Sequence, residues 1–405
     1  MAHVIVIGGG AAGMAAAIAA AACSDQVTIL ERMDRVGKKI LATGNGRCNL
    51  MNTGIPRFPG SESFAKQVLT RFGQEEQQRF WQHLGLRLRQ EEGGRVYPVS
   101  GQASTVLDTL RFTLEAMNVQ VITGVHVDGV FKARHGWTVM SGENKWKGDR
   151  VIIAGGGCAQ PKLGSDGSCW RLLTEYGHTL IDPRPALTQI LTDQDPIRGL
   201  SGIRVRCSVG VHRSGAVQYR ESGELLFADY GVSGVCVMQC ARYVQPGDEL
   251  RIRLTGSLGF ESLEDVRDEL FRRKAEWSNR PMTELLSGLC VPKLAMALMQ
   301  YSRVASITKR TCGSLCSGEI KSLIDTIDEF VLTVKGVKGF ESAQVTAGGL
   351  STDEFDPATL ESIHAPGLHA AGEVLDVDGD CGGFNLMFAF GSGVLAGLNG
   401  RNTPW

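Results

Sequence analysis

Buried-strand and helical patterns follow one another at the start of the chain. Residues 3–7 read HVIVI, which is typical of a buried strand, and residues 11–22 form an alanine-rich helical run. Residues 27–30 read VTIL and predict a second strand. A strand, a helix and a strand in this order predict the right-handed βαβ unit that begins an α/β fold with a parallel sheet.

A helix and further strands are predicted in the next part of the chain. The helix covers 101–117, where apolar residues recur with helical spacing. These residues are Val106, Leu107, Leu110, Leu114 and Met117. Short β-like runs follow at 119–123, 125–131 and 136–140. RVIIA at 150–154 then predicts a buried strand that leads directly into three glycines.

The pattern changes between about residues 190 and 345. Alternating runs predict antiparallel strands at 203–211, 216–220, 249–254 and 330–334. Residues 262–326 have mostly helical patterns instead, and glycine-rich α/β patterns return after 345. We therefore predict three parts. They are a discontinuous α/β domain at 1–190 and 345–405, an inserted β domain at 191–261 and 327–344, and a helical insert at 262–326.

Composition and charge are those of an ordinary globular protein with a full core. The chain of 405 residues has a formal net charge of -1, so its charge gives no reason to expect a nucleic acid or an anionic membrane as partner. Glycine is unusually frequent, with 51 residues that cluster at 8–13, 44–46, 155–157 and 379–397. Such clusters predict places where the backbone approaches a ligand closely.

The cysteines and the uncharged N-terminal run predict a reducing, cytoplasmic location. The 11 cysteines form no CxxC motif. The pairs Cys236/Cys240 and Cys312/Cys316 do not have a zinc or disulfide pattern, so we expect free thiols and no metal site. Residues 4–23 carry no charge, but no basic residue precedes them and glycines interrupt them, so we expect no membrane insertion.

The first motif is Gly8-x-Gly10-x-x-Gly13, between the first strand and the first helix. Gly8 allows a tight turn, Gly10 lets the backbone approach a pyrophosphate, and Gly13 lets helix and strand pack closely. The helix N-terminus at Ala11 and Ala12 offers free N–H groups to phosphates. Glu31 ends the second strand, where a carboxylate accepts hydrogen bonds from ribose hydroxyls, and Arg32 follows it.

A glycine-rich basic loop, VGKKILATGNGRCN at 36–49, follows Glu31. A domain that binds FAD needs a segment here to wrap the ribityl chain and the ring, although a solvated surface loop has a similar composition. The candidate contacts are Lys38, Lys39, Gly44, Gly46, Arg47, Cys48 and Asn49. We interpret Cys48 as a small residue packed near the flavin, because no resolving cysteine is close in sequence.

A second motif, VIIAGGG at 151–157, is a strand that runs into glycines. It predicts a second backbone approach to the cofactor at Ala154, Gly155 and Gly156. Val127, in the short sheet before this strand, is either a backbone contact of the adenine or an ordinary strand valine.

The third motif, AAGEVLDVDGDCGGFNLMFAFGSGVLAG at 370–397, is the most specific. A strand delivers Asp376, whose carboxylate can accept from a ribityl hydroxyl. A helix opens at about Phe384, and its N–H groups would face the pyrimidine edge of the flavin ring. Asn385 either bonds the ring or caps the helix. The remaining candidates in this motif are Gly372, Glu373, Gly382 and Gly383.

Long strings along nearly the whole chain resemble a known family. They include GKKILATGNGRCNLMN, AGGGCAQPKLGSDGS, FADYGVSGV and GEVLDVDGDCGGFN. The chain is similar to the bacterial FAD-dependent oxidoreductases that include the bile-acid-inducible NAD(P)H-dependent flavoprotein reductase and the aminoacetone oxidase-like flavoproteins. The resemblance implies FAD and a Rossmann-like, glutathione-reductase-like domain, split by a β-barrel-like domain with a helical subdomain. Val235 and Cys381 depart from the residues expected in this family and loosen the inference about substrate.

These motifs predict an FAD-dependent oxidoreductase with a small-molecule substrate. No second strand–GxGxxG–helix occurs between 155 and 350, so NADH or NADPH would bind transiently against the flavin, or the substrate itself would supply hydride. The acceptor would be an alkene-like compound or O2. Arg47, Tyr97 and Ser233 are the candidates for the substrate side.

Two other interpretations remain. One is an FAD-binding protein of RNA modification or redox sensing. We do not expect a nucleic-acid partner, because FRRK at 271–274 and KR at 309–310 are the only basic runs that suit RNA, and FRRK fits a solvated helix face. The other is a nicotinamide-only dehydrogenase that uses Glu31, which would leave the third motif without a role. The sequence makes no prediction of oligomeric state.

Overall fold

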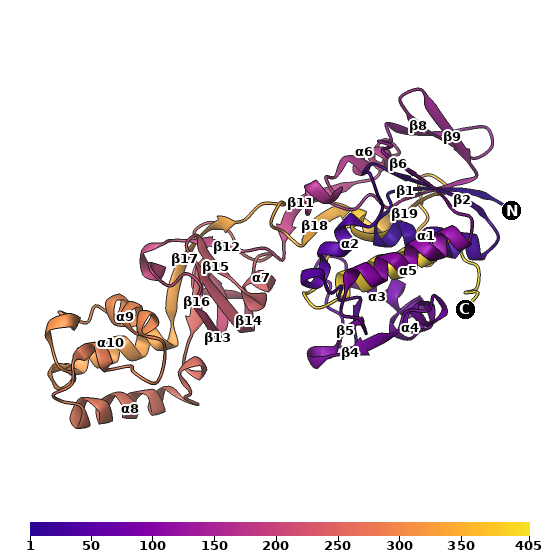
Figure 1. Cartoon of the computed structure of the whole chain (residues 1–405). Helices are drawn as coiled ribbons and strands as arrows, with labels where there is room; N and C mark the ends of the chain where they lie inside the picture. Colours follow the sequence, from indigo (N-terminus) through magenta and orange to yellow (C-terminus); the bar gives the residue numbers. More distant parts are fainter. The chain divides into compact units, whose positions relative to one another are not determined.

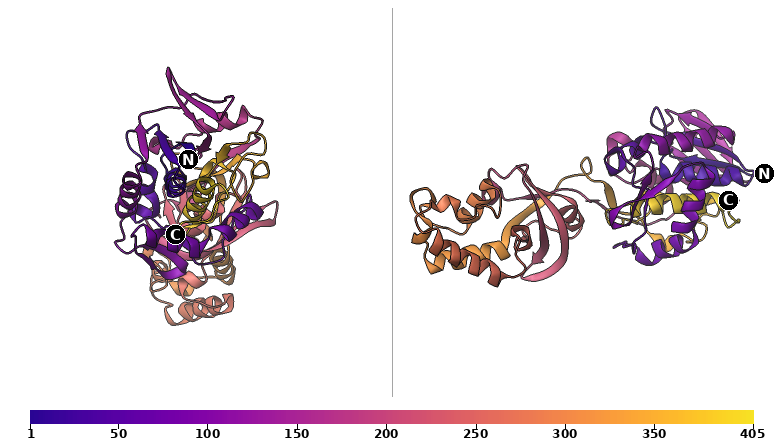
Figure 2. Two further views of the ribbon diagram at one scale, coloured as in Figure 1. Left: turned by 90° about the vertical axis from the view of Figure 1, so that its right-hand side faces the viewer. Right: turned by 60° about the horizontal axis from the view of Figure 1, so that its bottom comes forward.

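The computed structural model describes all 405 residues and divides into two compact units. The first unit contains Met1–Ala186 and Phe340–Trp405, and the second contains Leu187–Gly339. The N-terminal strands and the C-terminal helix therefore belong to the same unit, as Figures 1 and 2 show from three directions.

A five-stranded parallel sheet forms the centre of the first unit (Figure 1). Its strands, in spatial order, are β19 (Leu368–Ala370), β10 (Arg150–Ile153), β1 (His3–Ile7), β2 (Gln26–Glu31) and β6 (Gln120–Thr123). The strands β1 and β10 are buried on both faces, because nearly every residue in them is a β-branched hydrocarbon that is withdrawn from solvent. The carboxyl ends of all five strands lie at one edge of the sheet, where open α/β sheets bind their ligands.

Two helices from opposite ends of the sequence pack closely together beside this sheet. They are α1 (Ala11–Ala22) and α11 (Phe384–Leu398). A Cβ built at Gly393 would lie 2.3 Å from the carbonyl oxygen of Ala12, and one built at Gly397 would lie 2.2 Å from that of Ala16. Small residues at this interface therefore let the two backbones approach more closely than larger side chains would permit.

Shorter elements complete the first unit. The helix α5 (Ala103–Ala116) buries most of the predicted stripe, with Val106 and Leu110 fully withdrawn from solvent. The other helices are α2 (Lys38–Ala42), α3 (Glu62–Arg71), α4 (Gln74–His83) and α6 (Arg171–Thr174). One small sheet contains β3 (Met51–Asn52), β5 (Arg95–Pro98) and β4 (Leu88–Gln90), and another contains β7 (Gly129–Lys132), β8 (Trp137–Ser141) and β9 (Asn144–Gly148). The strands β11 (Leu180–Ala186) and β18 (Val345–Leu350) pair with each other.

The predicted β run at 125–131 is partly wrong. The strand β7 begins only at Gly129, so Val127 lies in the preceding loop and not in a sheet. The N–H of Val125 donates to the carbonyl oxygen of Glu31. This bond holds the segment before β7 against the end of β2, so the segment does not pair with a strand of the small sheet.

The second unit is a closed antiparallel barrel with a helical subdomain. The barrel strands, in spatial order, are β12 (Ile190–Thr192), β15 (Gly231–Ser233), β14 (Ala216–Ala228), β13 (Arg204–Arg213), β16 (Glu249–Arg253) and β17 (Phe330–Val337). The predicted strand at 216–220 is only the first part of the longer β14. The short helix α7 (Val235–Cys240) packs against β14, and alternate residues such as Val209, Leu250 and Leu332 fill the interior.

Three helices stand between β16 and β17 in the sequence. They are α8 (Leu263–Glu276), α9 (Pro292–Tyr301) and α10 (Ser317–Asp328). Ser262 caps α8 by accepting a hydrogen bond from the N–H of Asp265, as a capping box does. The predicted fold class is confirmed as a Rossmann-like sheet domain interrupted by an antiparallel barrel that carries helices. None of the helices combines the length and the apolar composition that a bilayer crossing demands.

Candidate nucleotide-binding site

The N-terminus of α1 lies at the carboxyl end of β1 and has no side-chain cap. A Cβ at Gly13 would lie 1.9 Å from the carbonyl oxygen of Gly8, so only glycine permits this close turn between strand and helix. A Cβ at Gly10, in contrast, would meet no atom within 4 Å. Space is therefore open beside the first turn, where Ala11 and Ala12 carry the N–H groups that a phosphate would accept from.

Glu31 connects this turn to the end of β2. One carboxylate oxygen accepts from the N–H of Gly9 at 2.6 Å, and the other accepts from the N–H of Met33 at 2.7 Å. Each oxygen keeps a further lone pair with which it could accept from a ribose hydroxyl. The next residue, Arg32, forms an ion pair with Asp166 and donates to the carbonyl oxygen of Gly164, which ties the 164–166 loop to the same edge of the sheet.

The glycines after β10 lie against the first motif. A Cβ at Gly8 would lie 2.5 Å from the carbonyl oxygen of Ala154, so the two loops are in van der Waals contact. Gly155 and Gly156 continue this loop beneath the side chains of Cys169 and Ser165. The loop with Val127 is also held at this edge, because it is bonded to the end of β2.

The basic loop after Glu31 reaches the third motif. The Lys39 ammonium lies 2.7 Å from one carboxylate oxygen of Glu373, and the other oxygen accepts from the N–H of Thr346 at 2.8 Å. Lys38 pairs instead with Asp34, on a different side of α2. This ion pair joins two stretches that are more than 300 residues apart in sequence.

The end of this loop has an unusual backbone. Gly44, Asn45, Gly46 and Cys48 all have positive φ angles between 54° and 83°, and two of them are not glycine. Residues rarely adopt this conformation without support from their surroundings, and it is frequent at functional sites. Burial raises the pKa of the Cys48 thiol to about 12, so the group is a neutral thiol at pH 7 and acts as a small packed side chain.

Arg47 and Tyr97 lie together. The Arg47 guanidinium stands over the Tyr97 ring, 4.2 Å from its centroid, and pairs with Glu91 at 2.6 Å. Glu91 also binds Arg89 at 2.8 Å, so one carboxylate positions two guanidinium groups. Tyr97 is mostly buried, whereas Arg47 is partly exposed to solvent. The structure thus brings together two of the three residues that we predicted for the substrate side.

The third, Ser233, lies in β15 of the second unit and is buried there. Its role stays a prediction. Glu91 was missed by the sequence analysis, because a carboxylate in a loop has no periodicity and its partner Arg47 is distant in sequence.

The N-terminus of α11 lies beside the basic loop and also has no side-chain cap. Its N-cap, Gly383, has a φ of 111°, and a Cβ there would lie 2.6 Å from the carbonyl oxygen of Met51 and 2.8 Å from the Asn49 side-chain oxygen. Asn52 donates to the carbonyl oxygen of Gly382 at 2.8 Å. Because these contacts hold the turn, the first N–H groups of α11, from Phe384 onward, remain for a ligand.

Two other residues of the third motif bind backbone groups. The Asn385 side chain accepts from the N–H of Gly379 and donates to the carbonyl oxygen of the same residue, so it closes the turn before α11. Asp376 accepts from the N–H of Gly348 at 2.9 Å with one oxygen. Its side chain is partly exposed, which leaves acceptor capacity for a hydroxyl group.

The two ends of the chain also touch directly. A Cβ built at Gly372 would lie 2.8 Å from the Cβ of Ala12. Two uncapped helix N-termini, the carboxylates Glu31 and Asp376, and the ammonium of Lys39 therefore belong to one edge of one unit. These donors and acceptors fit a dinucleotide with an anionic pyrophosphate and several hydroxyl groups.

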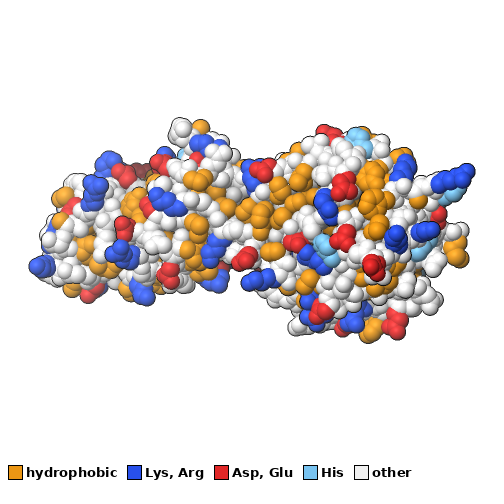
Figure 3. All heavy atoms as spheres, turned by 90° about the horizontal axis from the view of Figure 1, so that it is seen from above, with side chains coloured by type: hydrophobic (Ala, Val, Ile, Leu, Met, Phe, Trp, Pro, Cys, Tyr) orange, Lys and Arg blue, Asp and Glu red, His pale blue; other side chains and the backbone are white.

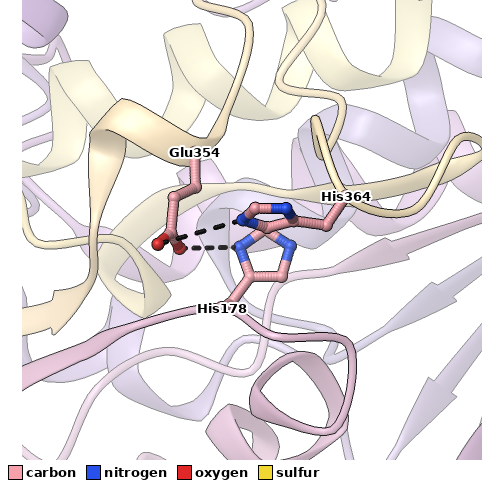
Figure 4. A group of neighbouring side chains, drawn as sticks. All are labelled: His178, Glu354 and His364. Carbon is pink, nitrogen blue, oxygen red and sulfur yellow. Dashed lines mark hydrogen bonds and ion pairs between the residues drawn. The ribbon is translucent and has the colours of Figure 1, made fainter.

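A second polar cluster lies elsewhere in the first unit (Figure 4). His178 contacts Glu354 through Nδ1 at 3.1 Å and Ser362 through Nε2 at 2.7 Å, and it stacks on Phe355. The Nε2 atom of His364 is 3.9 Å from the same glutamate. The ligand atoms of the two histidines and Glu354 lie within 4.8 Å of one another, a spacing at which they could hold a metal ion.

The cluster is also complete as a hydrogen-bond network. Burial lowers the pKa of His178, so its ring is neutral, and both ring nitrogens have protein partners. The sequence could not predict this group, because its members come from three separate segments.

Comparison with known proteins identifies the family. Residues 2–399 match the HI0933-like protein Rossmann domain. The chain belongs to the HI0933-like family. Membership implies FAD as the cofactor and makes the protein a flavin-dependent oxidoreductase.

The names of similar proteins point to different substrates. The chain is 37% identical to the 3-dehydro-bile acid delta(4,6)-reductase of Clostridium scindens over 100% of both chains. It is 27% identical to the ribosomal RNA dihydrouridine synthase of Haemophilus influenzae, over 98% of this chain and 97% of the relative. Among solved structures, a 3-ketosteroid-delta4-(5alpha)-dehydrogenase of Rhodococcus jostii is similar at 17% identity and a TM-score of 0.49, over 98% of this chain and 95% of that one.

Proposed function

We propose that the protein reduces a carbon–carbon double bond conjugated to a carbonyl group in a small organic molecule. The observation that carries this proposal is the full-length similarity to a 3-dehydro-bile acid delta(4,6)-reductase, whose name describes double bonds beside a 3-oxo group. The dihydrouridine synthases share this chemistry, because the uracil double bond is also conjugated to a carbonyl. FAD, when bound, supplies the hydride carrier for such a reaction.

The residues around the basic loop suit the acceptor side of this reaction. Reduction of a conjugated double bond places negative charge on the carbonyl oxygen, and a hydrogen-bond donor stabilises that charge. Arg47 has several N–H groups and gives only part of them to Glu91, so it can donate to the oxygen of a substrate. Tyr97, whose ring lies beneath the guanidinium, carries a hydroxyl and is the candidate proton donor to the carbon.

Other groups prepare the site for charge. The uncapped N-terminus of α11 would hold the pyrimidine edge of the ring, and its N–H groups and partial positive charge would favour a negative charge there by about 0.3–1 kcal/mol. Ser233 remains a further candidate for the substrate side. We propose that NADH or NADPH supplies the hydride after binding transiently, because the chain has no second dinucleotide-binding motif.

The test begins with the absorbance spectrum of the purified protein, which should have flavin bands. Under anaerobic conditions, NADH or NADPH should bleach these bands, and a 3-oxo-Δ4,6 bile acid or 2-cyclohexenone should restore them. Mass spectrometry should then find a product heavier by two hydrogens. If only O2 restores the colour, the protein is an oxidase and the proposed reduction is wrong. If no flavin binds even after reconstitution, the whole assignment fails.

Modification of ribosomal RNA is the second candidate. The observation in its favour is the similarity to two dihydrouridine synthases, at 27% and 28% identity over nearly the whole chain. Charge does not support it. On the face drawn in Figure 3, basic and acidic side chains are interspersed. In the FRRK run, Arg272 and Arg273 both pair with Glu269. The prediction of a solvated helix face is wrong for Arg273, which is buried and donates to the carbonyl oxygens of Leu285 and Ser287.

Nucleoside analysis distinguishes the two candidates. Ribosomal RNA without modifications is incubated with the protein and NADPH, digested, and examined for dihydrouridine. The small-molecule proposal expects none and expects rapid reoxidation by the enones. Dihydrouridine formation at a rate comparable with enone reduction would instead favour the RNA substrate.

A further inference from the structure

A basic pocket lies in the first unit beside the nucleotide-binding edge. It has a volume of about 370 Å³, within the range of small-ligand sites. Its lining residues are Arg35, Lys38, Leu41, Ala42, Lys162 and Leu163. They follow the carboxyl ends of β2 and β10, the two strands on either side of β1. The pocket thus stands where nucleotides bind to sheets of this kind.

The pocket has more positive than negative charge. Lys38 pairs with Asp34 at 2.5 Å, and that carboxylate is 75% exposed. Neither Arg35 nor Lys162 forms an ion pair with any carboxylate in the structure, and both are exposed. Like charges gathered in a concave surface raise the local potential and attract an anion.

The pocket lies on a different face of α2 from the ion pair between Lys39 and Glu373. On α2, Lys39 turns toward Glu373 and Ile40 is buried in the core. Lys38, Leu41 and Ala42 have the i, i+3, i+4 spacing of one helix face, and all three line the pocket. One short helix therefore contributes to two different surfaces.

The lining residues indicate the class of ligand. Three cations form one part of the wall, and the apolar side chains of Leu41, Ala42 and Leu163 form another. A nucleotide combines a phosphate with a flat, weakly polar base and a sugar. A phosphate monoester carries a charge of about −1.5 to −2 at pH 7. Arg35 and Lys162 together offer two unpaired positive charges to balance it, and Lys38 is already paired with Asp34.

We propose that this pocket binds the 2′-phosphate of NADPH and makes the protein prefer NADPH to NADH. The inference rests on the proposed function, because it names the hydride donor of the same reaction. Arg35 and Lys162 are the residues that carry it. Lys38 assists them, although it shares its charge with Asp34.

Equilibrium binding tests the inference without turnover. Calorimetry on the FAD-loaded protein compares 2′,5′-ADP with 5′-AMP, two probes that differ only in the 2′-phosphate. We expect 2′,5′-ADP to bind at least about tenfold more tightly, because its 2′-phosphate adds charge-assisted contacts. Arg35→Ala and Lys162→Ala should each remove most of this difference and leave 5′-AMP binding unchanged. Lys145→Ala, which removes an exposed cation on β9, is the matched control and should change neither.

Two results would overturn the inference. One is equal affinity of the wild-type protein for both probes. The other is a loss of FAD affinity in Arg35→Ala and Lys162→Ala, measured by flavin fluorescence on reconstitution, because the pocket would then serve the phosphates of FAD.

The two proposals can fail separately. Tight binding of 2′,5′-ADP without enone reduction would refute the proposed function alone. Equal kcat/KM values for NADH and NADPH in a working enone reductase would refute this inference alone.

Discussion

His369 should make the stability of the first unit depend on pH. It lies in β19 and is fully buried. Its Nδ1 atom is 3.0 Å from the carbonyl oxygen of Thr359, so Nδ1 carries the hydrogen and donates it. Its Nε2 atom is buried without any partner. A second proton at Nε2 would be a buried charge without compensation, and burial accordingly lowers the pKa of His369 to about 4.

The magnitude follows from linkage. In the unfolded chain, the pKa of a histidine is about 6.5, so between pH 6.5 and 4 the unfolded state binds a proton that the folded state does not. The contribution of neutral His369 to the free energy of unfolding is therefore fully present above pH 6.5, and it is lost as the pH falls from 6.5 to about 4. The free energy of unfolding should drop by about 2 kcal/mol between pH 7 and pH 5, and by about 3 kcal/mol once both states are protonated.

Urea denaturation at pH 7, 6 and 5 measures this loss. The His369→Gln variant should be less stable overall, but its free energy of unfolding should fall by about 2 kcal/mol less over the same range. Part of the wild-type dependence will remain, because burial also lowers the pKa of His178. The exposed His135 supplies the control, and His135→Gln should behave like the wild type. If His369→Gln retains the full pH dependence, the buried nitrogen is not its source.

Three further substitutions test the site. Gly13→Ala should abolish flavin binding, seen as loss of the flavin absorbance, because the new Cβ would lie 1.9 Å from the oxygen of Gly8. Asp376→Asn should weaken FAD affinity about fivefold to tenfold in a reconstitution titration, since the amide accepts more weakly than the carboxylate. Glu91→Gln should lower kcat/KM for an enone about tenfold, because Arg47 loses its ionic partner, whereas the exposed Glu92→Gln should not. Unchanged values in these assays would refute the corresponding assignment.

Much of the fold follows from short-range sequence signals. A continuous apolar run predicts β1 and an alanine-rich run predicts α1, and the structure has both. The stripe of α5 and the alternation in barrel strands such as β13 follow periods of 3.6 and 2 residues, and these elements are also present. The pairing of segments near Ala12 and Gly372 has no such local signal. It was predicted only because both motifs are typical of one cofactor and therefore should meet around it.

Other features lie beyond sequence patterns for physical reasons. The strands β3, β4 and β5 contain two to four residues each, which is too short for an alternation to be visible. The position of Val127 depends on one backbone bond to Glu31. The partnership of Glu91 with Arg47 and of Glu354 with His178 depends on tertiary proximity, which a single sequence does not encode in its spacing.

The packing of α1 against α11 has a consequence for the order of events during synthesis. The ribosome makes α1 before the second unit and α11 after it. The second unit is continuous in sequence and can complete its barrel while α1 still lacks its partner. A nucleotide site that uses the N-termini of both helices can therefore form only after α11 has been made, when the second unit has already been synthesised.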